Sequence, residues 1–373
     1  MKKYKIITYG CLANHSDSER IAKKLEDQGY LKSENPDLVI INICSIRQAA
    51  VDRAFAQAKK YKNVIVTGCL LKSDYDKFTK YAKIVKKENL FSVKPKNSCL
   101  IPIMTGCNNF CSYCVVPYTR GREYSRPPKE IIDEAKLFIN NGAKEIWLLG
   151  QNVNSYKYDF PKLLYKINSI PGDFWIRFLS SHPKDMGNDL IKSIRDLPKV
   201  TEYINLAVQS GDNEILKKMN RNYSIEEYKK LALKIKREIP NVCLSTDIIV
   251  GFPGETKKAF QNTVKLFKEI EFDMAYISKY SPRPGTLASK MKNQITFEEK
   301  SRRYSELNNL LKKISLKRNK QLIGQETRAL INNNFIGKTK NFKTIKVNGS
   351  SNNSFVDVKI TKALIWGLSG KIK

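Results

Sequence analysis

Three cysteines stand close together in the middle of the chain. Cys107, Cys111 and Cys114 are separated by three and then two residues, so a single loop can wrap their sulfurs around a compact iron–sulfur cluster. Three thiolates leave one iron of a four-iron cluster without a protein ligand, and an open position is what a catalytic metal site needs. A zinc knuckle would favour paired Cys-x-x-Cys hooks and a fourth ligand, and neither is visible nearby. This loop triplet therefore predicts a catalytic iron–sulfur centre.

A second set of cysteines is dispersed, but each member follows a predicted β-strand. Cys11, Cys44 and Cys69 form this strand-end triplet. The three strands are expected at residues 5–9, 37–43 and 63–67. Strands joined by crossover helices are parallel and their carboxyl ends share one edge of the sheet, so the three thiolates should meet there. The alternative is three buried, inert cysteines, but the repeated position at strand ends favours metal ligands.

Cys99 and Cys243 complete the eight cysteines of the chain, which has only two histidines, His15 and His182. Both cysteines lie in or beside strand patterns and match no ligand position, so we interpret them as core residues. In a reducing cytoplasm, so many cysteines are more typical of metal ligands than of disulfides. With two histidines, a zinc site of the Cys/His type is difficult to assemble.

The chain has 373 residues, which predicts more than one domain, and 41% of them are hydrophobic, as in globular proteins. Its formal net charge of +31 favours a polyanionic partner such as nucleic acid, although a general lysine bias explains the excess equally well. No apolar run reaches the roughly 18 residues of a membrane span, and the N-terminal apolar run is too short for a signal peptide. We therefore expect a cytoplasmic protein without a membrane segment.

The six candidate ligands can act together only in a fold that brings the ends of several strands close to one another. The hydrophobic pattern predicts such a fold. Residues 1–95 alternate strands with helical patterns, which indicates an N-terminal parallel-sheet α/β domain. Ser16 and Asp17 are expected to cap a first helix that reaches Gln28, and an alanine-rich helix is expected over 47–61.

Residues 96–321 continue the alternation and predict a partial (β/α)6 TIM-like barrel, with functional residues at the carboxyl ends of its strands. The expected strands are 100–105, 145–149, 175–179, 203–208, 244–250 and 274–279. The expected helices are 128–140, 189–196, 225–238, 257–270 and a long basic helix over 297–321. Residues 322–373 show no helical pattern and fit a small β-barrel. Its expected strands are 327–331, 344–347 and 355–360.

The Cys-x-x-x-Cys-x-x-Cys loop resembles the signature of the radical S-adenosylmethionine superfamily. In that superfamily the amino and carboxylate groups of S-adenosylmethionine chelate the open iron. One electron from the cluster then breaks a carbon–sulfur bond and yields a 5′-deoxyadenosyl radical, while the protein orients the cofactor. Tyr113 stands where the superfamily has an aromatic residue beside the adenine, and simple packing explains it equally well.

Further motifs narrow the resemblance to the methylthiotransferases, and it covers nearly the whole chain. These motifs are Tyr9–Cys11 with Asn14 and Asp17–Glu19, Asn42–Arg47, Val115–Arg126, Ser181–Pro183, Val208–Gly211, Asp247–Thr256 and Tyr280–Thr286. The tail resembles the TRAM domain, a small RNA-binding β-barrel. The chain departs from the family pattern at Leu12, Ala13 and Ala207, and its stretch between Cys69 and Cys107 is shorter than usual.

Residues 148–156 are similar to the branch that modifies N6-isopentenyladenosine beside the anticodon of tRNA. The resemblance implies addition of a 2-methylthio group with two [4Fe–4S] clusters, one on each cysteine triplet. The cluster on the strand-end triplet would carry the sulfur, and S-adenosylmethionine would provide both methyl group and radical. Other branches act on threonylcarbamoyl-adenosine in tRNA or on a ribosomal protein. An RNA-binding protein with a structural metal is the non-enzymatic alternative.

Polar residues at the ends of predicted barrel strands are candidates for holding S-adenosylmethionine. The alternative is that they only form hydrogen bonds within loops and helix caps. They are Gln151, Asn152, Ser180, Ser181, Gln209 and Asp247. Several basic residues are candidates for contacts with RNA phosphate groups. The alternative is that they only form part of a solvated protein surface. They are Arg120, Arg122, Arg126, Lys338, Lys340, Lys343 and Lys346. The resemblance also implies as partners the tRNA anticodon stem-loop, an electron donor such as flavodoxin or ferredoxin, and proteins that supply sulfur or iron–sulfur clusters.

Overall fold

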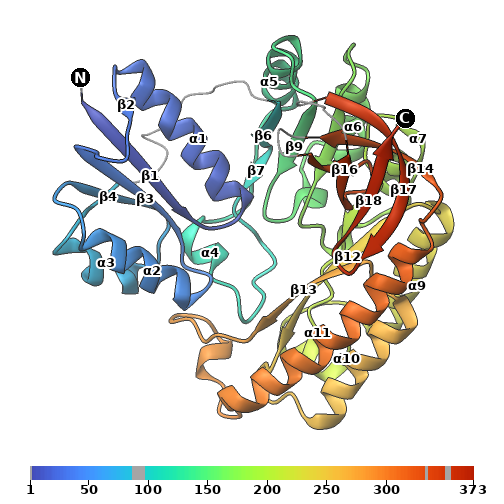
Figure 1. Cartoon of the computed structure of the whole chain (residues 1–373). Coiled ribbons are helices and arrows are strands. Elements are labelled where there is room, and N and C mark those ends of the chain that lie inside the picture. Colours follow the sequence, from blue (N-terminus) through green and yellow to red (C-terminus); the bar gives the residue numbers. More distant parts are fainter. Residues whose placement is uncertain (1, 86–96, 332–334, 349–353) are drawn as a thin grey trace.

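The computed structural model describes residues 2–85, 97–331, 335–348 and 354–373. Figure 1 shows a first sheet with its helices on one side of the molecule, a larger strand–helix array beside it, and a small red β-barrel packed on that array. The three kinds of architecture expected from the sequence are therefore present. Within these residues, no helix combines the length and the apolar character that a membrane crossing requires.

The N-terminal region contains a parallel five-stranded sheet. In sheet order its strands are β2 (Leu31–Lys32), β1 (Lys3–Tyr9), β3 (Leu38–Cys44), β4 (Val64–Cys69) and β5 (Lys83–Ile84). Its helices are α1 (Leu12–Asp27), α2 (Gln48–Ala58) and α3 (Lys72–Thr79). Ile41 and Val66 are fully buried, since the central strands are covered on both faces.

The start of α1 was predicted wrongly. The helix begins at Leu12, directly after Cys11, rather than at a cap formed by Ser16 or Asp17. Both side chains are buried within the helix and are used for contacts with the neighbouring region. Ser16 donates to the carbonyl of Leu100 at 3.4 Å, and Asp17 pairs with Arg120. Tertiary contacts therefore take up the oxygens that would otherwise cap a helix.

Six parallel strands form the partial barrel, in two three-stranded sheets. They are β6 (Ser98–Pro102), β9 (Glu145–Leu149), β10 (Trp175–Phe178), β11 (Tyr203–Asn205), β12 (Cys243–Val250) and β13 (Met274–Lys279). Isolated parallel bridges, Ile176 to Val200 and Ser181 to Leu206, join the two sheets between β10 and β11. The strand order therefore follows the sequence, as the barrel prediction requires.

Helices cover the outside of this array (Figure 1). They are α5 (Pro128–Asn140), α6 (Phe160–Asn168), α7 (Asn188–Asp196), α9 (Ile225–Glu238), α10 (Lys257–Ile270) and α11 (Phe297–Lys320). The short helix α8 (Asn213–Lys218) lies beside the cysteine loop, where the Lys218 carbonyl accepts from Ser112. Ser224 and Glu227 form a capping box at the start of α9. Short 3₁₀ helices are η2 (Val153–Ser155), η3 (Pro183–Asp185) and η4 (Ala288–Lys290).

The first barrel strand is shorter than predicted. The segment expected over 100–105 divides into β6 and β7 (Met104–Thr105), and β7 pairs antiparallel with β8 (Tyr124–Ser125). Pro102 ends β6, because proline has no backbone N–H to continue a ladder. The chain after β7 carries the loop triplet and α4 (Val116–Thr119), so this break sets where the loop leaves the sheet.

The tail is a closed five-stranded β-barrel in the order β14-β15-β16-β18-β17. Its strands are β14 (Glu326–Ile331), β15 (Ile336–Thr339), β16 (Thr344–Asn348), β17 (Ser354–Leu364) and β18 (Gly367–Ile372). The sequence pattern missed β15 and β18, both of which contain glycine. Closure nevertheless confirms the small barrel, since it removes exposed sheet edges.

This small barrel docks on the amino ends of the large barrel's strands, opposite the strand ends that carry the predicted site. The buried Arg177 of β10 donates to the carbonyls of Thr339 at 3.0 Å and Lys340 at 2.9 Å, and pairs with Glu145. Lys343 is also buried and donates to Asp273 at 2.7 Å. The tail is thus part of the large barrel's packing.

Candidate functional site

The carboxyl edge of the first sheet faces the large barrel, and side chains from both regions hold the two together. Arg283, whose side chain is 1% exposed, donates to Asp74 at 3.0 Å. Arg47 donates to the hydroxyl of Ser278 at 2.9 Å. Buried ion pairs tie the regions in one geometry, because removing one partner leaves an uncompensated charge.

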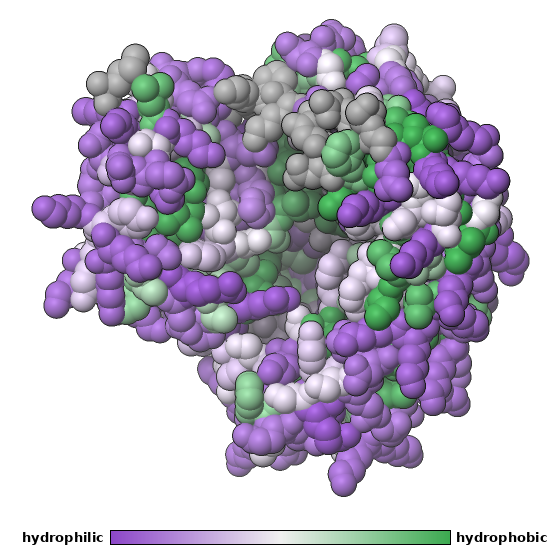
Figure 2. Space-filling view, viewed as in Figure 1, coloured by the Kyte–Doolittle hydropathy of each residue, from purple (hydrophilic) through white to green (hydrophobic). Residues whose placement is uncertain are grey.

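A cavity of about 690 Å³ lies between the two regions. Figure 2 shows a deep hollow in the face of the molecule between the N-terminal region and the barrels, with hydrophobic residues in its walls. Cys11 and Cys44 line the cavity from the first sheet, and Gln151, Ser180 and Asp247 line it from the large barrel. We call this space the central cavity. It brings together residues that lie more than a hundred positions apart in the sequence.

The strand-end triplet gathers as the parallel topology predicts. Cys44 and Cys69 are the last residues of β3 and β4 and are partners in the strand register, and Cys11 follows β1 next to β3. Hydrogen bonding to Cys69, together with burial, raises the pKa of the Cys44 thiol. Gly68 has a φ of +106°, and a Cβ there would lie 2.4 Å from the Asn42 side chain. Glycine therefore permits the close packing just before Cys69.

Asn14 and Arg120 complete the surroundings of this triplet, and the sequence analysis did not assign them there. The Asn14 side chain accepts from the Cys11 thiol at 3.5 Å and lies 4.0 Å from the Cys69 sulfur. The Arg120 Nε donates to the Cys69 sulfur at 2.7 Å, and its Nη2 donates to Asp17 at 3.2 Å. Burial by itself would lower the pKa of Arg120, but the charges of Cys69 and Asp17 outweigh it and raise the pKa.

The loop triplet also receives N–H donors at each sulfur. Asn109 donates to Cys107 at 3.4 Å, the Val116 amide donates to Cys114 at 3.5 Å, and Arg221 donates to Cys111 at 3.7 Å. Such donors stabilise thiolate ligands and tune the potential of a cluster. Burial is the main cause that raises the pKa of the Cys114 thiol to about 12. The three side chains are partly exposed.

Residues after α8 hold the loop in place. Asn220, with a φ of +57°, donates to the carbonyls of Asn109 at 3.2 Å and Phe110 at 3.1 Å. The buried Arg221 also donates to the carbonyl of Ala207, and Tyr223 donates to Val208 at 2.9 Å. The sequence gives no signal for this support, since Asn220 and Arg221 lie about 110 positions from the loop.

The predicted S-adenosylmethionine contacts fall into two groups. Gln151, Ser180 and Asp247 line the central cavity, and the Gln151 Oε1 is buried without a hydrogen-bond partner among the described residues. Burial raises the pKa of Asp247. The other candidates are used within the protein or placed elsewhere. Asn152 donates to Asp185 at 2.7 Å, and the Gln209 backbone bonds to Asp247 at 2.8 Å.

Ser181 and Tyr113 lie outside the residues that line the central cavity. The Ser181 hydroxyl is buried without a hydrogen-bond partner among the described residues. Tyr113 packs beside Ile215 and Met219 in an apolar cluster, and burial raises its pKa well above the usual value. Tyr113 thus makes packing contacts, and its contact with S-adenosylmethionine stays a prediction.

Several basic residues predicted to contact RNA phosphate have partners inside the protein. Arg120 and Lys343 are buried and paired, as described above. Arg126 donates to Glu134 at 2.8 Å, and Lys340 pairs with Glu202 at 3.3 Å. Lys338 is half-buried and donates to Thr344 at 2.8 Å. Arg122 and Lys346, in contrast, are exposed.

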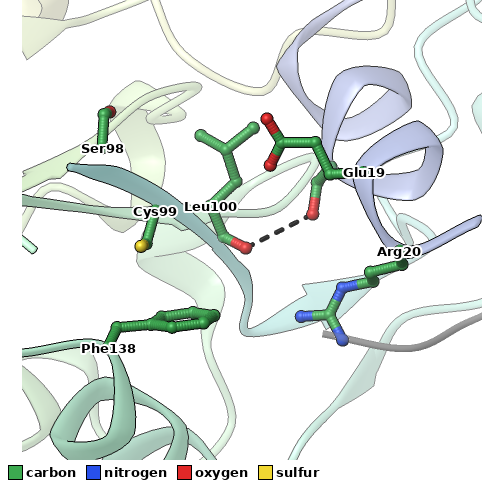
Figure 3. Close-up of a pocket in the computed structure, with 7 residues that line it drawn as sticks. Glu19, Arg20, Ser98, Cys99, Leu100 and Phe138 are labelled. Atoms are coloured by element: carbon green, nitrogen blue, oxygen red, sulfur yellow. Dashed lines mark hydrogen bonds between the residues drawn. The ribbon is translucent and has the colours of Figure 1, made fainter. Parts of the chain in front are cut away.

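Cys99 and Cys243 are buried, at 3% and 0% exposure. Figure 3 shows Cys99 beside Phe138, at a space lined by β6 and α1. That space is about 10 Å³, roughly the room of one water molecule. The geometry supports the interpretation of both cysteines as core residues.

Comparison with known proteins adds to this geometry. A model described as the Radical SAM superfamily matches residues 101–267, and one described as Uncharacterized protein family UPF0004 matches residues 3–88. The chain is 40% identical to the tRNA-2-methylthio-N(6)-dimethylallyladenosine synthase of Caldicellulosiruptor saccharolyticus, over 100% of this chain and 92% of the relative. It is 39% identical to the protein of that name from Clostridium botulinum strain Okra, over 98% of this chain and 96% of the relative.

Among solved structures, the chain is similar to the radical S-adenosylmethionine methyltransferase TsrM from Kitasatospora setae. The TM-score is 0.57 at 13% identity, and the match covers 77% of each chain, so it shows a shared fold. Fold and loop together define a radical S-adenosylmethionine enzyme, a class that uses a [4Fe–4S] cluster and S-adenosylmethionine. Within that class, the chain belongs to the family of tRNA methylthiotransferases.

The residues present fit these cofactors. In the part of the chain that the structure describes, no three Cys, His, Asp or Glu side chains converge on a point where they could hold a single metal ion. N–H groups donate to all three sulfurs of the loop triplet and to Cys69 of the strand-end triplet, and hydrogen bonds of this kind tune the potential of an iron–sulfur cluster. The buried Gln151 Oε1, without a hydrogen-bond partner among the described residues, would be available to accept from the amino group of a bound S-adenosylmethionine.

Proposed function

We propose that this enzyme adds a methylthio group to carbon 2 of N6-isopentenyladenosine beside the anticodon of tRNA, using two [4Fe–4S] clusters. One observation carries the proposal: Cys11 and Cys44 share a cavity with Gln151, Ser180 and Asp247 at the barrel strand ends. A sulfur held on the first sheet and a radical source held on the barrel then face one substrate. The names of the two relatives support the same reaction.

Each part of the chain has a role in this proposal. The loop triplet holds the cluster that leaves one iron open. When bound there, S-adenosylmethionine supplies a 5′-deoxyadenosyl radical and a methyl group. Gln151, Ser180 and Asp247 orient that molecule from the strand ends. The second cluster sits on the strand-end triplet, where Asn14 and Arg120 position its ligands.

The cavity walls suit a radical reaction. The hydrogen on carbon 2 of the adenine is not acidic, so no side chain needs to act as a base. Val116, Leu149 and Leu179 line the cavity with nonpolar atoms, which exclude water from the reacting groups. The residues therefore act by orientation and exclusion.

We further propose that the tail contributes RNA affinity. Lys359 and Lys371 are exposed and stand opposite each other across β17 and β18, and Lys362 and Lys346 are exposed as well. Trp366, 52% exposed at the turn between these strands, offers a ring on which a base can stack. Lysines beside an aromatic platform are typical of single-stranded RNA contacts.

The wider assignment follows the same proposal. Residues 1–95 form the domain with the second cluster, 96–321 the radical-forming barrel, and 322–373 the RNA-binding β-barrel. The partners are the tRNA anticodon stem-loop, an electron donor such as flavodoxin or ferredoxin, and proteins that supply sulfur or clusters. The proposed location is the cytoplasm.

Nucleoside analysis tests the function directly. tRNA from cells with the gene should contain 2-methylthio-N6-isopentenyladenosine, and tRNA from cells without it should retain N6-isopentenyladenosine. Reintroducing the gene should restore the product, and reintroducing a Cys107→Ala variant should not. Unchanged 2-methylthio content after removal of the gene would refute the proposed function.

A further inference from the structure

A second pocket, of about 320 Å³, opens beside the central cavity. The two spaces share Ala13, Leu149, Gly150 and Gln151 in their linings. We call the second space the side pocket. The two spaces therefore adjoin at these four residues, and a ligand in the central cavity lies next to the side pocket.

The inner wall of the side pocket is nonpolar. Pro102, Met104 and Leu149 line it, and Met104 is only 3% exposed. Gly150 shapes this wall, since a Cβ at its position would lie 2.4 Å from the Met104 Cγ. Tyr124 is 61% exposed and therefore marks the rim. Burial of a hydrocarbon group against such a wall is favourable, because it removes nonpolar surface from water.

Charged side chains also line the side pocket, but each has an opposite charge as its partner. Arg20 and Arg126 both pair with Glu134 of α5, at 2.5 and 2.8 Å. Arg120 pairs with Asp17. A carboxylate entering here would lose water and find no cation without a partner among these lining residues, which makes its burial costly.

We propose that the side pocket receives the substituent on N6 of the target adenine and selects a branched hydrocarbon over an anionic group. The inference rests on the proposed function and deepens it. A nonpolar wall rewards the isopentenyl group. The paired charges exclude an amino-acid substituent such as threonylcarbamoyl, which carries a carboxylate.

Binding measurements test this selection without turnover. Four anticodon stem-loops differ only at N6 of the target adenosine, which carries hydrogen, isopentenyl, saturated isopentyl or threonylcarbamoyl. Fluorescence anisotropy with the cluster-loaded enzyme should give affinities about tenfold or more higher for the two hydrocarbon forms than for hydrogen, because several buried methylene groups contribute. The threonylcarbamoyl form should bind no better than the hydrogen form.

Two matched pairs of variants locate the effect. Met104→Phe fills the pocket and should reduce the preference for isopentenyl over hydrogen at least threefold, whereas the volume-conserving Met104→Leu should keep it. Glu134→Gln leaves Arg20 and Arg126 without their shared carboxylate and should improve threonylcarbamoyl binding several-fold. Glu130→Gln, which alters an exposed partner of Arg126 alone, should not. Circular dichroism and iron content establish that each variant is folded and loaded.

The outcomes distinguish a failure of the side-pocket proposal from a failure of the proposed function. If wild-type enzyme methylthiolates the isopentenyl substrate but neither Met104→Phe nor Glu134→Gln alters discrimination, the side pocket is not the N6 site. The same conclusion follows if Met104→Phe fails to fold and Glu134→Gln leaves threonylcarbamoyl binding unchanged. If the wild-type enzyme methylthiolates none of the four stem-loops, the proposed function itself is wrong.

Discussion

The two cysteine triplets bring three sulfurs together in different ways. Cys107, Cys111 and Cys114 lie within eight residues of one loop, whereas Cys11, Cys44 and Cys69 come from the ends of three neighbouring strands. The loop depends on distant residues for support, such as Asn220 and Arg221. The strand-end triplet is placed by the sheet, and Arg120 from beyond the sheet donates to Cys69. A local motif is thus recognised from its spacing alone, while a set of residues brought together by topology is recognised only once the strands and their parallel order are predicted.

Removing the loop triplet should have the largest effect. A Cys107→Ala, Cys111→Ala, Cys114→Ala variant should lose both 5′-deoxyadenosine formation and methylthiolated tRNA, since no open iron remains to bind S-adenosylmethionine. Reconstituted wild-type enzyme should carry about eight irons per chain, and the variant roughly half of that. Iron analysis and product chromatography measure both. Persistent cleavage of S-adenosylmethionine would place the radical site elsewhere.

Removing the strand-end triplet should abolish methylthiolation but leave cleavage of S-adenosylmethionine. A Cys11→Ala, Cys44→Ala, Cys69→Ala variant should still convert S-adenosylmethionine to 5′-deoxyadenosine but form no 2-methylthio product. Because metal ligands can stabilise a fold, circular dichroism must first show that the N-terminal region is folded. Methylthiolated product from the folded variant would show that these cysteines are not the sulfur site.

Arg120 sharpens the comparison, because it follows the loop triplet in sequence but donates to Cys69 of the strand-end triplet. Arg120→Gln should lower product formation about ten- to a hundredfold, as losses of partners to metal ligands commonly do. The 5′-deoxyadenosine yield should fall less. The absorption spectrum of the second cluster, isolated in the loop-triplet variant, should shift.

Arg122→Gln is the matched control for Arg120, since Arg122 is exposed and lies over the Phe110 ring. It should leave that spectrum unchanged. Equal losses of both activities in Arg120→Gln, with no spectral change, would assign Arg120 to packing between the two regions.

The two lysines Lys343 and Lys346 test whether RNA affinity is separate from both triplets. Lys343→Ala should destabilise the protein by about 1.5–3 kcal/mol, because the buried Asp273 loses one of its two basic partners and keeps Arg318. Lys346→Ala should leave the melting temperature unchanged, weaken tRNA binding, and reduce its salt dependence by about one counterion. Thermal unfolding and anisotropy across salt concentrations measure these effects. An unchanged salt slope would remove Lys346 from the RNA contact.

Much of the fold follows from periodicity. The segments 145–149, 128–140, 225–238, 257–270 and 274–279 coincide with β9, α5, α9, α10 and β13. Their apolar positions repeat strongly, and caps such as Ser224 mark their ends. The pattern failed where tertiary contacts decide, as at Ser16 in α1, and where strands contain glycine, as in β15 and β18.

For the site, residue type and spacing indicated the cysteines but not their surroundings. Positive charge suggested that Arg120, Arg126 and Lys343 would lie on an RNA-binding surface, yet all three are bound to acidic residues inside the protein. A sequence shows the charge of a side chain and not its partner. Charge is therefore informative only for exposed residues such as Lys346, and exposure depends on the fold.

The docking of the small barrel also sets an order of events on the ribosome. Arg177 reaches carbonyl groups that lie 162 and 163 residues later in the chain. At synthesis rates of about 5–20 residues per second, these partners emerge on the order of ten seconds after Arg177. During that interval the buried Arg177 and Asp273 lack partners they have in the finished protein. The large barrel therefore completes its packing only after the tail is made, and chains interrupted before Thr339 expose a charged, unfinished surface to chaperones and proteases.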